Sequence, residues 1–492
     1  MNPPRPCHFA PVTRRDALLR TGLGLGWLGA ASLLETEAAA ANAANAAVAP
    51  APAPAPERIH RSLAPRPPHF PARAKAVIHL FANGGPSHLD TFDRKVALEK
   101  YAGQEVPGTL PTERRTGAAL PSPFAFRRYG ESGLEISDLF PSVARHADRL
   151  LVVRSMHADV PNHEPSLMLM NCGDSRLVRP AVGAWVTYGL GTENQNLPGF
   201  VAMCPGGYPI KSTENWRNAF LPGAYQGTYV DTAKRKVEDL VENVRHPFLD
   251  RDAQRRQFDL TTALDRKHLA ARDHDPQLEA RLASMELAWR MQAEAGEAFD
   301  VTREPQHVRD RYGDDTQGRQ MLIARRLVER GVRYVQVWHG EGQPWDSHDA
   351  IGKNHARLAK ECDQAIGALL DDLVGRGMLD STLVLWGGEF GRTPTVELPA
   401  PGTGVSEPSG RDHNHHGFTV WMAGGGVRGG TVHGATDEFG FKAVEKPVHV
   451  HDLQATMLHL LGLDHTRLTY RHSGRDFRLT DVHGRVVPEL LG

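Results

Sequence analysis

The sequence predicts an α/β protein in which helices cover both faces of a mainly parallel central sheet. Short apolar runs alternate with segments of helical spacing along the chain, which is the order that such a sheet requires. Polar residues follow several of these runs, and binding sites in open α/β sheets lie beyond the carboxyl ends of the strands. We therefore expect one large domain whose site is assembled from loops.

The strands and helices are expected in alternation. Apolar runs predict strands over residues 76–81, 149–156, 200–203, 333–338, 381–386 and 418–422. Helical spacing predicts helices over 136–147, 164–170, 317–330, 355–374 and 451–461. A charged block over 231–300 has helical spacing and lacks strand-like runs, so we interpret it as a helical insertion.

The first residues indicate export. Arg14 and Arg15 precede an apolar run over 21–34 and then an alanine-rich tract, which is typical of a twin-arginine signal. The run is too short and too glycine-rich to span a bilayer, so we expect no integral membrane segment. We predict a signal peptide over 1–46, an Ala/Pro-rich linker over 47–72 and the α/β domain over 73–492. The expected location is the periplasm or the exterior.

Composition excludes some classes of partner. Lys plus Arg total 57 and Asp plus Glu total 58, so no overall field favours nucleic acid or an anionic membrane. Cys7 falls in the signal, and the three other cysteines are too scattered for a disulfide framework or a thiolate metal site. The oligomeric state stays open.

A histidine cluster points to a metal. His413, His415 and His416 fall within four residues, next to Asp412. Charged imidazoles so close together would repel each other, whereas neutral imidazole and carboxylate are natural ligands of a divalent ion. The alternative interpretation is a glycine-rich, exposed loop that happens to contain several histidines. We favour the metal, with zinc first and calcium or manganese as alternatives.

Polar residues at the strand ends are expected to meet this cluster. They follow four different strands, and the carboxyl ends of neighbouring parallel strands share one edge of a sheet. The expected metal ligands are Asp346, His348, Glu389, His413, His416 and Asp90, and the expected substrate-binding residues are Asn83, Asn162 and Ser87.

Four blocks of the sequence resemble a known family. Residues 81–93 (FANGGPSHLDTFD), 345–348 (WDSH), 388–394 (GEFGRTP) and 410–413 (GRDH) are similar to the signature blocks of the twin-arginine-exported domain-of-unknown-function family 1501. Residues 452–462 (DLQATMLHLLG) resemble the final helix shared by sulfatases and alkaline phosphatases. The resemblance runs from about residue 76 to the C-terminus. It implies the alkaline phosphatase/sulfatase fold, in which metal ions polarise a phosphate or sulfate ester while a nucleophile attacks.

The resemblance also implies roles for single residues. Asp346 and His348 resemble a metal-binding pair, and Glu389 stands where the superfamily has an Asp-His pair. Asn83 stands in place of a metal-binding aspartate, which Asp90 would then replace.

The nucleophile is the main departure from the superfamily. Counting back from Gly173 places His163 where Ser, Thr or Cys is usual, which argues against a formylglycine nucleophile. We expect His163 to act as nucleophile or general base and Arg392 to pair with the anion.

Two functions follow. The first is an exported metal-dependent hydrolase of a small anionic ester, either a phosphate or a sulfate. The second is a degenerate superfamily member that acts as an exported binding or assembly protein without turnover.

Overall fold

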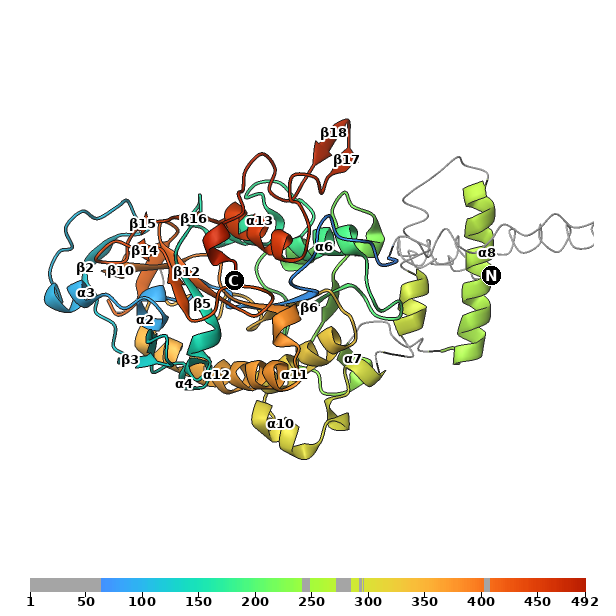
Figure 1. Ribbon diagram of the computed structural model, residues 1–492, viewed down its shortest axis with the longest axis horizontal. Coiled ribbons are helices and arrows are strands. Elements are labelled where there is room, and N and C mark those ends of the chain that lie inside the picture. The colour runs from blue at the N-terminus through green and yellow to red at the C-terminus, as the bar shows by residue number, and fades with distance from the viewer. Residues whose placement is uncertain (1–62, 241–247, 271–284, 292–293, 295, 402–407) are drawn as a thin grey trace, which may run out of the picture. The chain divides into compact units, whose positions relative to one another are not determined.

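A nine-stranded sheet forms the centre of the computed structural model, which describes residues 63–240, 248–270, 285–291, 294, 296–401 and 408–492 (Figure 1). Its strands run in the order β13-β5-β12-β9-β1-β8-β6-β7, and β16 pairs with β5. Their bounds are β1 Ala76–Phe81, β5 Leu150–His157, β6 Phe200–Met203, β7 Thr228–Val230, β8 Tyr334–Trp338, β9 Thr382–Gly387, β12 Phe418–Ala423, β13 Thr431–His433 and β16 Val448–His449. The predicted α/β class is confirmed, and the six predicted strands are all present.

Strand β12 runs against its neighbours. Its pairings with β5 and β9 are antiparallel, whereas the other described pairings in this sheet are parallel. The first residue of β12 therefore lies at the edge where the parallel strands end, which we call the carboxyl edge. The histidine segment that precedes β12 reaches this edge only because of that reversal.

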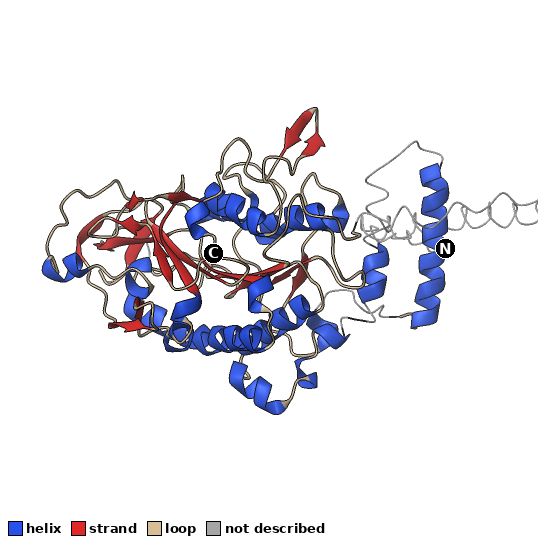
Figure 2. Ribbon diagram, viewed as in Figure 1, coloured by secondary structure: helices blue, strands red, loops and turns tan. Residues whose placement is uncertain are grey.

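Helices cover both faces of the sheet (Figure 2). The side chains of a strand alternate between faces, so Ile78 and Leu80 of β1 join one core and Val77 and Phe81 join the other. The first core contains α4 Pro141–Ala144, α11 Thr316–Glu329 and α12 Ile351–Gly375, and the second contains α5 His163–Cys172, α6 Val182–Leu190 and α13 Val450–Leu460.

Smaller elements complete the described part. A three-stranded sheet, β11-β10-β2, carries several polar residues and consists of β2 Thr116–Ala119, β10 Gly391–Glu397 and β11 Arg411–Asn414. Further strands are β3 Phe126–Tyr129, β4 Leu134–Ser137, β14 Ala435–Thr436, β15 Ala443–Glu445, β17 Tyr470–His472 and β18 Arg475–Phe477. Further helices are α2 His88–Thr91, α3 Val96–Lys100, α7 Val237–Leu240, α8 Arg251–Ala270 and α10 Gln306–Tyr312. Short 3-10 helices lie at Ala147–Arg149, Ser212–Trp216, Gly223–Tyr225, Val301–Arg303, Leu379–Ser381 and Pro488–Leu490.

The helix predicted over 136–147 is wrong for most of its length. Its start lies in β4, which pairs antiparallel with β3, and a single helical turn begins only at Pro141. Proline suits the first turn of a helix because its missing N–H would have no helical partner there. The apolar spacing came from a strand and a short helix in succession.

The predicted signal and most of the predicted linker lie outside the described residues. Residues 63–72, expected to belong to the linker, are attached to the domain: the N–H of Arg66 donates to the carbonyl of Leu190, and that of His69 to Gly462. The described parts of the 231–300 block are mainly helical, and Phe258 of α8 stacks on Trp289. Within the described residues, no helix combines the length and apolar character that a membrane span needs.

Candidate metal centre

Four side chains converge at the carboxyl edge of the sheet. His163 starts α5, Asp346 and His348 lie in the loop between β8 and α12, and His413 lies on β11, shortly before β12. One nitrogen or oxygen from each of the four lies within 4.8 Å of the others. We call this group the four-residue cluster. Sequence analysis placed all four at the site, three of them as metal ligands and His163 as a catalytic residue.

The three imidazoles surround one carboxylate. The Nε2 atoms of His348 and His413 lie 2.9 Å and 3.3 Å from Asp346 Oδ1. The Nε2 atom of His163 lies 3.4 Å from the other oxygen, Oδ2. All three rings therefore direct Nε2 toward the carboxylate of Asp346.

Each imidazole is held from behind by its own glutamate. The three Nδ1–glutamate distances are 2.6 Å for His163 and Glu389, 2.5 Å for His348 and Glu397, and 2.7 Å for His413 and Glu113. A carboxylate only accepts hydrogen bonds, so each Nδ1 carries the hydrogen. This fixes the tautomer and leaves the Nε2 lone pair facing the cluster, an arrangement usual behind metal-binding histidines.

The donor set fits a metal ion. His163 Nε2 and His348 Nε2 are buried, and neither makes a hydrogen bond within the described residues, although both lie close to Asp346. Nitrogen lone pairs that face a carboxylate repel it unless protons or a cation lie between them. Three imidazoles and one carboxylate are ligands that a divalent transition metal prefers.

Without an ion, protons take that position. Burial lowers the pKa of His163, but the carboxylates of Asp346 and Glu389 outweigh burial and raise the pKa to about 9. The pKa of His348 is raised against burial in the same way. Burial raises the pKa of Asp346, but Arg392 and the imidazoles hold it well below its ordinary value. The cluster is thus a place where positive charge is strongly stabilised.

Arg392 holds the cluster in place instead of facing solvent. Its side chain is fully buried, and Nη2 lies 2.6 Å from Asp346 Oδ1. Nε donates to the carbonyl of Gly85 at 2.8 Å, Nη1 donates to that of Arg411 at 3.1 Å, and Nη2 also donates to that of Gly84. We expected Arg392 to pair with an incoming anion. In the structure its guanidinium donates to Asp346 and to three backbone carbonyls instead.

Two glycines let the segments of the site approach each other. A Cβ at Gly84, where φ is +111°, would lie 2.5 Å from the backbone nitrogen of Asp346. A Cβ at Gly410 would lie 2.1 Å from the carbonyl carbon of His348. The N–H of Gly84 also donates to both oxygens of Glu389. Any side chain at either position would displace the loop that carries Asp346 and His348.

Asp90 and Ser87 lie apart from the cluster. Arg411 donates from Nε to Asp90 Oδ2 at 2.9 Å and from Nη2 to Oδ1 at 3.3 Å. Ser87 Oγ donates to Asp90 Oδ2 at 2.5 Å, and all three side chains are fully buried. The structure does not bring Asp90 to the metal position or Ser87 to a substrate position, because each already satisfies a buried partner.

Three further expected residues occupy supporting positions. Asn83 donates from Nδ2 to the carbonyls of Gly340 and Gly342, which fixes the loop after β8. Asn162 donates to Glu113 at 2.6 Å. Glu389 binds an imidazole and takes no place in the four-residue cluster itself.

His416 lies outside the cluster. Its ring packs against that of His415, with centroids 3.9 Å apart. His413, which lies in β11, is the histidine of that segment that faces Asp346.

Sequence reasoning missed Glu113 and Glu397. Glu397 ends β10, eight positions after Glu389. The only sequence feature that could have indicated its role is its position close to the GEFGRTP block. Glu113 lies in an irregular segment before β2, where nothing in the sequence marks it.

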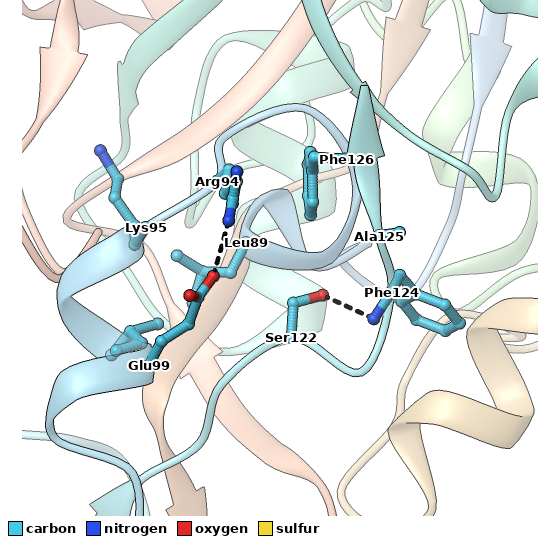
Figure 3. Close-up of a pocket in the computed structure, with 9 residues that line it drawn as sticks. Leu89, Arg94, Lys95, Glu99, Ser122, Phe124, Ala125 and Phe126 are labelled. Carbon is cyan, nitrogen blue, oxygen red and sulfur yellow. Dashed lines mark hydrogen bonds and ion pairs between the residues drawn. The ribbon is translucent and has the colours of Figure 1, made fainter. Parts of the chain in front are cut away.

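A cavity of about 270 Å³ lies elsewhere in the domain (Figure 3). None of the four-residue cluster lines it. Its two cationic residues are paired, Arg94 with Glu99 at 2.9 Å and Lys95 with Asp93 at 3.1 Å. This cavity is therefore separate from the four-residue cluster.

Comparisons with known proteins give a family but no activity. No curated protein matches the chain. Similar solved structures include the PsFucS1 sulfatase from Pseudoalteromonas sp. (12% identity, 80% of this chain and 68% of that chain, TM-score 0.34) and the lipoteichoic acid synthase LtaP from Listeria monocytogenes (10%, 86% and 78%, TM-score 0.32). Another is the alkaline phosphatase from the Antarctic bacterium TAB5 (9%, 79% and 98%, TM-score 0.29). Likeness at this level carries no argument about chemistry. The model of the family described as "Protein of unknown function (DUF1501)" matches residues 74–491, and the chain therefore belongs to that family.

Proposed function

We propose that the protein is a metal-dependent hydrolase of phosphate or sulfate esters, with a single divalent ion held by His163, Asp346, His348 and His413. One observation carries the proposal: three imidazoles direct Nε2 to one carboxylate while a separate glutamate holds each Nδ1. The ester class rests on the resemblance of the sequence blocks to the alkaline phosphatase/sulfatase superfamily.

Zinc is the ion that this donor set favours. Imidazole suits zinc, whereas calcium takes oxygen ligands and manganese prefers carboxylate and water. A bound divalent ion supplies positive charge that polarises an ester oxygen and stabilises charge in the transition state.

The protein side chains then have distinct tasks. We assign His163 as a ligand in place of a nucleophile, because Glu389 fixes its tautomer and its Nε2 faces Asp346. Arg392 orients Asp346. Asp346 and His348 are the most exposed members, at 19% and 14% of the side chain against 7% for His163 and 4% for His413. A substrate therefore approaches from the side of Asp346 and His348.

A second function has one observation in its favour. Four protein ligands complete a tetrahedral zinc site, and catalytic zinc sites keep one position open. This favours an exported binding or assembly protein that keeps the metal without turnover.

Metal analysis followed by a substrate screen separates the two functions. Purified protein is expected to contain one zinc per chain by elemental analysis and to hydrolyse one class within a panel of phosphate and sulfate monoesters and diesters. Both properties should be lost in His348→Ala and kept in His433→Ala, whose histidine lies in β13. If the protein binds zinc but hydrolyses no ester, the result favours the binding or assembly protein. If it binds no zinc, the result contradicts both proposed functions.

Export is part of the proposal. Arg14 and Arg15 precede a short apolar run as in twin-arginine signals, so replacing both with Lys should trap a full-length precursor in the cytoplasm. Arg5→Lys, outside the pair, is the matched control and should be exported normally. Processed periplasmic protein from the double variant would contradict this route.

A further inference from the structure

An exposed segment, which we call the strap, contacts the metal centre through Glu113 and Arg114. It comprises residues 107–115, between buried Val106 and the start of β2 at Thr116, and it contains no helix or strand. Most of its residues are exposed or half-buried. Long, irregular surface segments of this kind are where proteins place movable covers over binding sites.

Within the described residues, the carboxylate that holds His413 Nδ1 comes from the strap. Glu113 binds His413 Nδ1 through one oxygen and accepts from Asn162 Nδ2 through the other, at 2.7 Å and 2.6 Å. Its side chain is 26% exposed, whereas those of Glu389 and Glu397 are fully buried. Of the three glutamates, Glu113 is the one that surface motion can withdraw.

The neighbouring residue secures the strap to the other side of the centre. The N–H of Arg114 donates to Asp412 Oδ2 at 2.7 Å, and its guanidinium lies 3.1 Å from Glu397 Oε1. Glu397 in turn holds His348. Glu113 therefore contacts one imidazole directly, and Arg114 contacts the glutamate that holds a second imidazole.

Side-chain contacts and one backbone hydrogen bond anchor the end of this segment. The last strap residue, Arg115, accepts a backbone hydrogen bond from Leu398 of the neighbouring segment, and β2 continues from there alongside β10. The contacts of Glu113 and Arg114 described above all involve at least one side chain. Breaking them would remove these anchors of the segment without breaking a strand pairing.

We propose that residues 107–115 form a gate over the metal centre and that Glu113 is the positioning residue that couples closure of the gate to retention of the ion. The inference rests on the proposed metal centre. When the strap is closed, Glu113 fixes the tautomer of His413 and the ion is held. When it opens, His413 loses that partner and the centre is exposed to solvent, so the ion is released.

Metal release gives the first test. Protein loaded with Co²⁺ or Zn²⁺ is mixed with excess chelator, and loss of the ion is followed by the cobalt absorption spectrum or by a zinc indicator. Glu113→Gln is expected to release the ion about 10–100-fold faster than the parent chain, the size of effect that outer carboxylates have on metal affinity. Glu105→Gln, an exposed change just outside the strap, is the matched control and should release it at the parent rate.

Proteolysis gives the second test, independent of any activity. The strap contains the trypsin sites Arg114 and Arg115, and the ion is expected to protect them in the parent chain. Glu113→Gln should be cleaved there at the metal-free rate even when loaded. Circular dichroism establishes that the variants are folded.

The outcomes separate the strap from the centre. Protein that binds the ion but is cleaved at Arg114 and Arg115 equally with and without it contradicts the gate and leaves the metal centre intact. Unchanged release in Glu113→Gln also contradicts the gate. Protein that binds no ion contradicts the centre itself, and the gate with it.

Discussion

Asp90 is fully buried and Asp346 is half-buried. Each pairs with a fully buried arginine, but only Asp346 belongs to the proposed metal centre. Asp90 accepts two bonds from Arg411 and one from Ser87, and this group is complete. Asp346 pairs with Arg392 but also faces imidazole nitrogens that lack hydrogen bonds. A buried charge whose partners are all present stabilises the fold, because any added ligand would have to break existing bonds. Where a charged group faces donors or acceptors that lack hydrogen bonds, a ligand can bind to those atoms without breaking existing bonds.

The largest expected effect tests the structural side of this comparison. Asp90→Ala leaves the Arg411 guanidinium buried without its partner, and removing one member of such a pair costs about 3–5 kcal/mol. Urea denaturation should show that loss, while the amount of metal bound per folded chain stays the same. Asp476, in an exposed pair with Arg471, is the control, and Asp476→Ala should cost at most about 1 kcal/mol. A loss of metal in folded Asp90→Ala would overturn the assignment of Asp90 as purely structural.

The next effect tests the binding side. His413→Ala removes a nitrogen from the cluster and should weaken zinc binding by more than about 100-fold, beyond the range seen for outer partners. The gain in thermal stability that zinc gives to the parent chain should disappear in parallel, since a ligand stabilises only the state that binds it. His416→Ala, three positions further on, should bind zinc like the parent. The reverse result would make His416 the metal ligand, which the sequence had predicted together with His413.

The last effect concerns pH. In the metal-free protein the pKa of His163 is raised from 6.5 to about 9. A raised pKa in the folded state contributes stability that is fully present below pH 6.5 and is lost as pH rises toward 9. Zinc must displace that proton, so its affinity should increase over the same range. Denaturation of metal-free protein at a series of pH values should show the loss, and calorimetry in buffers of different ionisation enthalpy should show proton release on binding. His163→Gln should lack this part of the stability change, and an identical pH profile in both proteins would contradict the pKa assignment.

The sequence was most informative about the framework. Every predicted strand was found because continuous apolar runs such as residues 76–81 are typical of strands buried on both faces. The helix over 136–147 was wrong because a short strand and a one-turn helix in succession imitate helical spacing. The family resemblance read from four motif blocks is confirmed by the match over residues 74–491.

The site was only partly predictable. Asp346 and His348 could be placed because they lie in the loop that follows a predicted strand. Choosing among His413, His415 and His416 required the conformation of the turn before β12, which periodicity does not encode. The roles of Glu113 and Glu397 depend on pairs formed across long separations in sequence, with His413 and His348 respectively. Polar strand ends show where a site will form, but they do not show which of its carboxylates bind histidine and which bind arginine, as Asp90 demonstrates.

The wide sequence spacing of the cluster has a consequence for folding. Its members range from His163 at the start of α5 to His413 on β11, so no short stretch of the chain contains the site. Contacts across such separations require closure of long loops, which makes them slow to form. An ion that needs all four side chains can therefore bind only after the sheet has assembled around them. The fraction of chains that hold a tightly bound metal then measures how much of a preparation has reached the native fold.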